Sequence, residues 1–289
     1  MKVNEVLRKY SLVAKKYTKN NSVFIVDTNN GKYVYKDVKP NNEILNYLKT
    51  RNFDYLPKLI SGENENYQLM NYLKDYNIPK EQKILDMIVL VALLHNKTTH
   101  YKEVSIDEYE KIYDDLANNI DYLYGYYDDL MTIIESKVYM SPSEYLLARN
   151  ISMIYKMLDS SKKRLDKWYD LVKEKRKQRN VVLHNNLNLD HFIRNSKSYL
   201  INWDKAKIGN PVFDIYKLYK RHVLDFEFSD VLKEYEGHYP FTEDEKQLFL
   251  VLISLPSIIK FDDTEYNMCS KISREIDTLY KSEYITKKV

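Results

Sequence analysis

The chain has 289 residues, of which 44% are hydrophobic and 30% charged, enough to bury a core as one large domain or two closely packed lobes. Its formal net charge of +3 comes from interspersed acids and bases, so nothing points to nucleic acid or a membrane surface as a partner. The single Cys269 excludes an internal disulfide, and the longest apolar run, Ile88–Leu94, is too short to span a bilayer. We expect a cytoplasmic protein.

The first third of the chain reads as strands around a single helix. Residues Ser22–Asp27 and Lys32–Lys36 have the composition and alternation of strands, and Asn29–Gly31 between them is a hairpin turn signal. After Pro40, apolar side chains recur at helical spacing, at Ile44, Leu45 and Leu48. Two further strands follow, separated by a turn around Gly62: Pro57–Ile60 and Tyr67–Asn71.

The rest of the chain is mostly helical. Helical periodicity predicts helices over 81–100, 105–137 and 142–178, with Ser105 and Ser141 as helix starts. The segment 181–204 interrupts this pattern with Val181–Leu183, a polar loop and two short strands, Phe192–Ile193 and Tyr199–Ile201, and the chain is helical again after Pro211. We therefore predict an α+β protein with a small β-rich N-lobe (1–73, a sheet plus one helix) and a large helical C-lobe (74–289).

Three segments carry candidate chemistry. Lys36 ends the second predicted strand and Glu43 lies in the next helix. His184 begins a loop that runs through Asn186 and Asp190 to His191 and then into apolar residues, and the third segment contains Asn202 and Asp204. In this order the segments resemble the aminoglycoside phosphotransferase and choline kinase branch of the protein-kinase-like fold, near the bacterial spore-coat kinase-like proteins.

The resemblance implies a protein-kinase-like two-lobed fold and a nucleotide site between strand and loop residues. In such a site Lys36 and Glu43 would pair to hold nucleotide phosphates, and an ordinary surface pair is the alternative interpretation. Met70 and Tyr72, at the start of the connector between the lobes, would contact the nucleotide. His184 would hold the backbone of the catalytic-type loop.

The residues on which the family's chemistry depends are altered. By the same matching, Asn186 stands at the position of the catalytic base, His191 at that of the loop metal ligand, and Asn202 at that of the principal metal aspartate. A carboxamide cannot accept the acceptor's proton, and losing a positioned base lowers a rate by about 10² to 10⁴. Magnesium prefers anionic oxygen ligands, so an amide and an imidazole make a poor metal site.

Two residues offer a partial rescue, and one further segment is altered. Asp204 takes the family's secondary acidic position and retains a carboxylate for a metal. Asp190 is adjacent to His191, but its side chain is expected to point away from the acceptor. The phosphate-covering turn, Tyr17–Ser22, contains no glycine, which makes close backbone approach to phosphates harder.

Two functional hypotheses follow. The first is a pseudokinase with impaired phosphoryl transfer that acts by binding a protein partner, as in a spore-coat-like assembly, or a nucleotide. The alternative is an active ATP-dependent phosphotransferase that modifies a small hydroxyl-bearing acceptor using Lys36, Asp204 and Asp190. The resemblance implies ATP and magnesium as cofactors, and the three substitutions weaken the case for both.

Overall fold

The computed structural model describes residues 2–20, 23–62 and 64–288. The chain divides into two compact units. The first unit comprises Met1–Thr99 and Val181–Gly209, and the second comprises His100–Asn180 and Asn210–Val289. Each unit is thus built from two separate segments of the chain.

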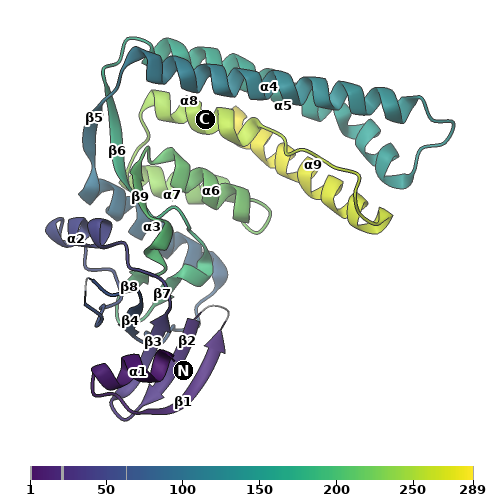
Figure 1. Ribbon diagram of the computed structural model, residues 1–289. Helices are drawn as coiled ribbons and strands as arrows, with labels where there is room; N and C mark the ends of the chain where they lie inside the picture. Colours follow the sequence, from purple (N-terminus) through teal and green to yellow (C-terminus); the bar gives the residue numbers. More distant parts are fainter. Residues whose placement is uncertain (1, 21–22, 63, 289) are drawn as a thin grey trace. The chain divides into compact units, whose positions relative to one another are not determined.

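A four-stranded antiparallel sheet in the order β1-β2-β3-β4 forms the N-terminal part of the first unit (Figure 1). Its strands are β1 (Ala14–Asn20), β2 (Val23–Thr28), β3 (Gly31–Lys36) and β4 (Gln68–Asn71). The turn between β2 and β3 contains Gly31 at a φ of 110°, a backbone conformation that favours glycine. The register of β3 and β4 pairs Lys36 with Gln68, so these two side chains start from neighbouring backbone positions.

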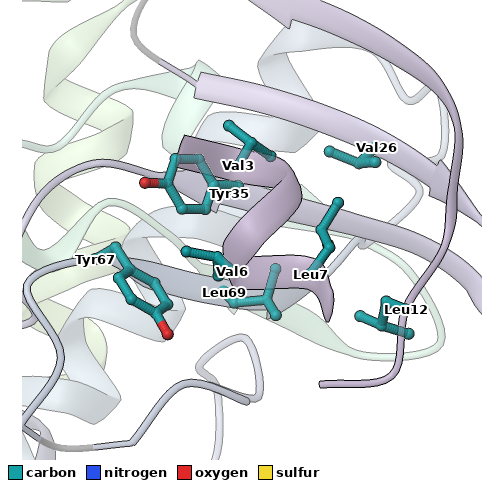
Figure 2. Packing of buried hydrophobic residues seen from close by; sticks show 8 residues of the cluster. All are labelled: Val3, Val6, Leu7, Leu12, Val26, Tyr35, Tyr67 and Leu69. Atoms are coloured by element: carbon teal, nitrogen blue, oxygen red, sulfur yellow. The ribbon is translucent and has the colours of Figure 1, made fainter. Parts of the chain in front are cut away.

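Helix α1 (Lys2–Lys9) packs on this sheet (Figure 2). Val3, Val6 and Leu7 follow helical spacing, and all three are buried. They lie in one cluster with side chains from β2, β3 and β4, namely Val26, Tyr35 and Leu69. The cluster gives the small sheet an apolar covering that a two-layer arrangement requires.

The rest of the first unit surrounds a short hairpin. Its elements are α2 (Asn42–Thr50), α3 (Lys80–Thr98), η1 (Leu189–His191), β7 (Phe192–Arg194), β8 (Ser198–Leu200), η2 (Trp203–Lys205) and β9 (Lys207–Gly209). Helix α3 packs against η1, β7 and β8. The connector after β4 is tied to β7, because the Tyr76 amide donates to the Arg194 carbonyl at 2.7 Å and the Arg194 amide donates to Asp75 at 2.8 Å.

The second unit is mainly helical. Helices α4 (Ile106–Glu135) and α5 (Pro142–Val172) form a long hairpin, and α6 (Val212–His222), α7 (Phe228–His238), α8 (Glu243–Ser254) and α9 (Glu265–Lys288) complete the helical part (Figure 1). Strand β5 (His100–Glu103) pairs with the first half of β6 (Lys177–Leu183). Among the described residues, every helix is too short or too polar to cross a bilayer.

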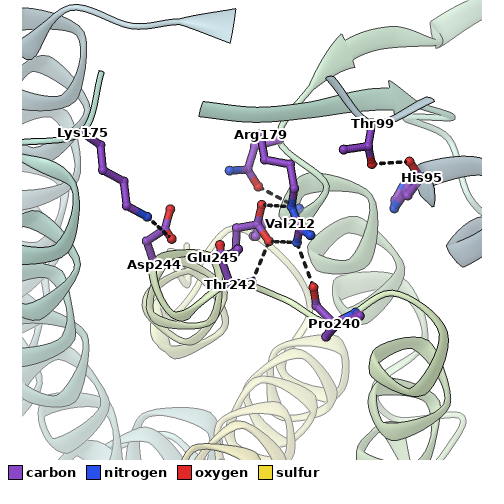
Figure 3. Close-up of polar contacts among 10 residues, drawn as sticks. His95, Thr99, Lys175, Arg179, Val212, Pro240, Thr242, Asp244 and Glu245 are labelled. Atoms are coloured by element: carbon purple, nitrogen blue, oxygen red, sulfur yellow. Dashed lines mark hydrogen bonds and ion pairs between the residues drawn. The ribbon is translucent and has the colours of Figure 1, made fainter. Parts of the chain in front are cut away.

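A buried ion pair braces the start of α8 (Figure 3). Glu245 is 1% exposed and accepts a hydrogen bond from Arg179 Nε at 3.0 Å. Its other oxygen accepts from the Thr242 amide at 3.0 Å, which closes a capping box at the helix N-terminus. Arg179 also donates to the Pro240 carbonyl at 2.9 Å, so both charged groups are well supplied with partners.

Several predictions from the sequence are confirmed. The hairpin around Asn29–Gly31 and the helix after Pro40 form, and Ser105 and Ser141 cap the two long helices through their side chains. The two short strands after the loop are β7 and β8. The α+β class is therefore observed.

Other predictions are wrong at the level of single elements. Pro57–Ile60 is not a strand of the sheet, because only Leu59 bridges to Met70. The helix expected over 142–178 ends at Val172, and Lys177–Asn180 pairs with β5 instead. The N-terminal part holds α1 as well as α2, where one helix was expected. Ser22 and the end of the turn Tyr17–Ser22 lie outside the described residues.

Candidate functional site

Lys36 is the central cation of the candidate site. It ends β3 and is 9% exposed, so its ammonium group is largely withdrawn from water. Burial lowers the pKa of Lys36 from its ordinary value, because desolvation disfavours the charged form. A nearby carboxylate acts in the opposite direction by favouring the ammonium form.

That carboxylate is Asp204. It forms an ion pair with Lys36, and its other oxygen accepts a hydrogen bond from Gln68 Nε2 at 2.8 Å. Lys36 and Gln68 are register partners on β3 and β4, so the sheet presents both donors to a single carboxylate. Asp204 lies in η2, where the neighbouring Trp203 is buried and donates from Nε1 to the Leu200 carbonyl at 2.8 Å.

Asn202 links Lys36 to the loop. Its backbone is left-handed, with φ 68° and ψ 55°, a conformation that Asn adopts more readily than most residues. Because an ammonium group can only donate, the amide atom facing Lys36 is Oδ1, at 2.5 Å. The amide nitrogen of Asn202 then faces His191 Nε2, at 3.0 Å.

The contacts of His191 assign its tautomer. Nδ1 lies 2.7 Å from the carbonyl oxygen of Asn186, which can only accept, so Nδ1 carries the proton. Nε2 is therefore the acceptor for the Asn202 amide. A continuous chain of hydrogen bonds runs from Asn186 through His191 and Asn202 to Lys36 and ends at Asp204.

Two side chains at the start of the loop donate to backbone carbonyls at or next to η2. His184 is fully buried and its Nε2 donates to the Ile201 carbonyl, outside the loop, at 2.9 Å. Asn185 has a φ of 60°, and its side chain donates to the Lys205 carbonyl at 2.8 Å. The loop is thereby tied to both sides of η2.

The structure places the remaining predicted residues outside this chain of contacts. Glu43 is exposed on α2, and the carboxylate that contacts Lys36 is that of Asp204, which differs from the expected Lys36–Glu43 pair. Asp190 is exposed on η1. Tyr72 is 37% exposed, and its amide donates to the Lys32 carbonyl at 3.0 Å.

Met70 lines a small hollow together with Gln68, Asn202 and Asp204. The hollow measures about 30 Å³. A water molecule fits such a space, whereas pockets for drug-sized ligands measure roughly 300–1,000 Å³. Gln68 is the residue that sequence reasoning missed, since the strand could be predicted but its register with Lys36 could not.

The polar groups present do not fit a magnesium ion. Both Asp204 oxygens and Asn202 Oδ1 already accept from Lys36 or Gln68, and His191 Nε2 accepts from Asn202. Within the described residues, no group of three or more His, Cys, Asp or Glu side chains is arranged to hold a metal ion. Magnesium favours anionic oxygen in near-octahedral geometry, which a single engaged carboxylate does not supply.

Comparison with known proteins identifies the fold. Residues 18–248 match the sequence profile of the phosphotransferase enzyme family. The chain resembles an aminoglycoside phosphotransferase from Alicyclobacillus acidocaldarius, with a TM-score of 0.69 and 8% identity over 96% of this chain and 93% of that one. No curated protein sequence matches the chain.

Two structures of a spectinomycin phosphotransferase are also similar. The AMP-bound complex gives a TM-score of 0.55 and 14% identity over 99% of this chain and 92% of that one. The complex with ADP and spectinomycin gives a TM-score of 0.53 and 10% identity over 98% of each chain. At these identities the likeness concerns the fold alone, and it confirms the predicted protein-kinase-like α+β fold.

Proposed function

Because the chain belongs to the phosphotransferase enzyme family, we propose that it is a pseudokinase of that family, in which phosphoryl transfer is impaired and binding is the function. The observation that carries the proposal is the chain of contacts from Asn186 to Asp204. Lys36, His191, Asn202 and Asp204 are each engaged by another side chain or by the backbone.

The missing base is the first chemical obstacle. Asn186 stands where the family's catalytic aspartate is expected, and its amide side chain cannot take a proton from an acceptor hydroxyl. Asp190, the nearest carboxylate in sequence, is exposed on η1. Loss of a positioned base lowers the rate by about 10² to 10⁴.

The second obstacle is the metal. Asn202 replaces an anionic ligand by a neutral one, and its side-chain amide already forms hydrogen bonds with Lys36 and His191. Without a metal to neutralise phosphate charge, the stabilisation on which phosphoryl transfer mainly depends is lost. Both obstacles support a binding role, with a protein partner or a nucleotide as the ligand, in the cytoplasm or in a spore-coat-like assembly.

The alternative is an active ATP-dependent phosphotransferase acting on a small hydroxyl-bearing molecule. The retained pair of Lys36 and Asp204 favours it, because a buried lysine and one carboxylate remain at the nucleotide end of the site. Solved structures of similar fold include one with bound ADP and spectinomycin and one with bound AMP. In this version Asp204 would have to release Lys36 and Gln68 to bind a metal.

The test compares the protein with a variant that regains the family residues. ADP release from ATP is measured with magnesium and with manganese for the wild type, for Asn186→Asp/His191→Asn/Asn202→Asp, and for the triple variant with Lys36→Met added. We expect turnover at background level in the wild type, a rise of at least about tenfold in the triple variant, and loss of that rise with Lys36→Met. Metal-dependent turnover by the wild type that Lys36→Met abolishes would establish the alternative.

Nucleotide binding is tested separately by thermal unfolding with ATP, with and without magnesium. Because the donor set does not fit the metal, any stabilisation by ATP should be the same in both conditions. The Lys36→Met variant should lose it, since in this proposal the Lys36 ammonium is the cation that meets the phosphate. A stabilisation that requires magnesium would contradict the proposal.

A further inference from the structure

The second unit contains a cavity of about 490 Å³ that the proposed function does not use. Its walls come from the end of α6, from the segment 255–264 between α8 and α9, and from the first half of α9. The volume lies within the range of roughly 300–1,000 Å³ that is typical of small-molecule pockets. The following residues supply its basic side chains: Lys220, Arg221, Lys260, Lys271 and Arg274.

The side chains that line this cavity carry a strong net positive charge. Five basic and two acidic side chains line it, a net charge of +3 that equals the formal net charge of the whole 289-residue chain. Charges of one sign gathered around a hollow concentrate the field there and attract ions of the opposite sign. The cavity is thus suited to an anion.

The two carboxylates that line the cavity both contact other groups of the protein. Glu275 accepts a hydrogen bond from the Ser257 amide at 2.7 Å, and Asp262 lies 3.7 Å from the Lys271 ammonium. In the described part of the chain, the side chains of Lys260 and Arg274 form no ion pair or hydrogen bond. Two cations at the cavity therefore keep their donors for a ligand.

The floor of the cavity is apolar and fixed in place. Val223 and Ile259 are 3% and 6% exposed. Tyr126 donates to the Ile259 carbonyl and Tyr127 to the Ser257 carbonyl, both at 2.6 Å, so the wall that carries Lys260 is anchored to α4. A pre-formed wall lowers the ordering cost of binding.

We propose that this cavity binds a small phosphate-bearing anion. Arginine and lysine together match phosphate well, because guanidinium donates two parallel hydrogen bonds and ammonium supplies a compact charge. The apolar floor accommodates the non-charged part of such a molecule. The site does not depend on whether the protein transfers phosphoryl groups.

Titration calorimetry with inorganic pyrophosphate at about 150 mM salt tests the site, since at that ionic strength exposed surface charges are largely screened beyond about 8 Å. The test variant is Lys260→Ala/Arg274→Ala. The matched control is Lys163→Ala/Lys167→Ala, which removes two exposed lysines from α5, outside the cavity. All four substituted positions are exposed, so both variants should keep the fold, and circular dichroism verifies this.

We expect saturable binding by the wild type and the control with equal Kd, and a Kd at least about tenfold higher in Lys260→Ala/Arg274→Ala. A Kd unchanged in that variant, an equal loss in the control, or no saturable binding by the wild type overturns the inference. Lys36→Met separates this site from the one in the first unit. The Kd of Lys36→Met for pyrophosphate should match that of the wild type. If Lys36→Met loses binding while Lys260→Ala/Arg274→Ala binds normally, the inference is also overturned.

Discussion

The ion pair between Lys36 and Asp204 should contribute to the stability of the first unit, and a double-mutant cycle measures how much. The two side chains are 11% and 21% exposed. Asp204→Asn removes the carboxylate and leaves a buried ammonium with Asn202 Oδ1 as its remaining strong acceptor. Lys36→Met removes the cation and leaves a carboxylate that still accepts from Gln68.

The expected magnitude follows from the burial of the pair. Breaking a fully buried pair by removing one partner costs about 3–5 kcal/mol, and an exposed pair contributes about 0–1 kcal/mol. The partial exposure of Asp204 places this pair between the two cases. We expect Asp204→Asn to lower the free energy of unfolding by about 2 kcal/mol and Lys36→Met by about 1 kcal/mol, with a coupling energy of about 1 kcal/mol.

The assay must report on one unit at a time, because the two units need not unfold together. Trp203 lies in the first unit and Trp168 in the second. In a Trp168→Phe background, tryptophan fluorescence during urea unfolding follows Trp203 and therefore the first unit. The single variants and the double variant are measured in that background, and equal m-values show that the same surface unfolds in each.

An exposed ion pair within the sheet serves as the control. Lys32 and Asp27 lie 3.3 Å apart on neighbouring strands, but their side chains are 58% and 34% exposed. Solvent screens such a pair, so its coupling energy should stay below about 0.5 kcal/mol. If the Lys36–Asp204 coupling is no larger than that of the control, the partial burial of the pair does not strengthen it and the reasoning is refuted.

Three further predictions concern the rest of the molecule. Glu245→Ala leaves the Arg179 guanidinium without its carboxylate partner in a buried position and should lower the free energy of unfolding by about 3–5 kcal/mol in urea titrations, whereas a change below about 1 kcal/mol would contradict the buried pair. Leu7→Ala opens a cavity between α1 and the sheet and should cost about 2–5 kcal/mol, since Leu7 is 1% exposed; an unchanged midpoint would show that α1 is not docked. Burial raises the pKa of Tyr109 to about 12 and raises the pKa of Tyr127 as well. The contribution of these two tyrosines to the free energy of unfolding should therefore be fully present below pH 10 and be lost as pH rises from 10 toward their folded-state pKa values. Phenolate absorbance at 295 nm checks this, and reversible ionisation of all 28 tyrosines near pH 10 would count against it.

Local sequence signals were sufficient to predict elements whose backbone hydrogen bonds are made by residues close in the sequence. Ser105 and Ser141 cap their helices, and the turn at Gly31 joins two strands in direct register. The order of motifs from Lys36 to Asp204 was also enough to predict the protein-kinase-like fold. These features depend on residue types at short, regular spacing, which a single sequence displays.

The sequence analysis did not predict the elements that form only by pairing or packing with segments distant in the sequence. Strand β1 is almost wholly exposed and polar, so no alternation marks it, and it forms because β2 provides a neighbouring edge. Residues Lys177–Asn180 continue a helical composition but are drawn into a strand by His100–Glu103. Helix α1 is short, and its helicity depends on the apolar surface of the sheet beneath it.

The composition of the site was determined by the sequence alone. From the sequence alone we predict that Asn186, His191 and Asn202 depart from the family pattern, and a neutral amide such as that of Asn186 or Asn202 cannot act as a base or an anionic ligand. Only the tertiary structure decided how the remaining charges pair. The register of β3 and β4 sets Lys36 beside Gln68, and η2 brings Asp204 to both, so the lysine meets this carboxylate instead of Glu43. Such a pairing joins residues more than 130 positions apart, and it is decided by packing and desolvation, which no local pattern records.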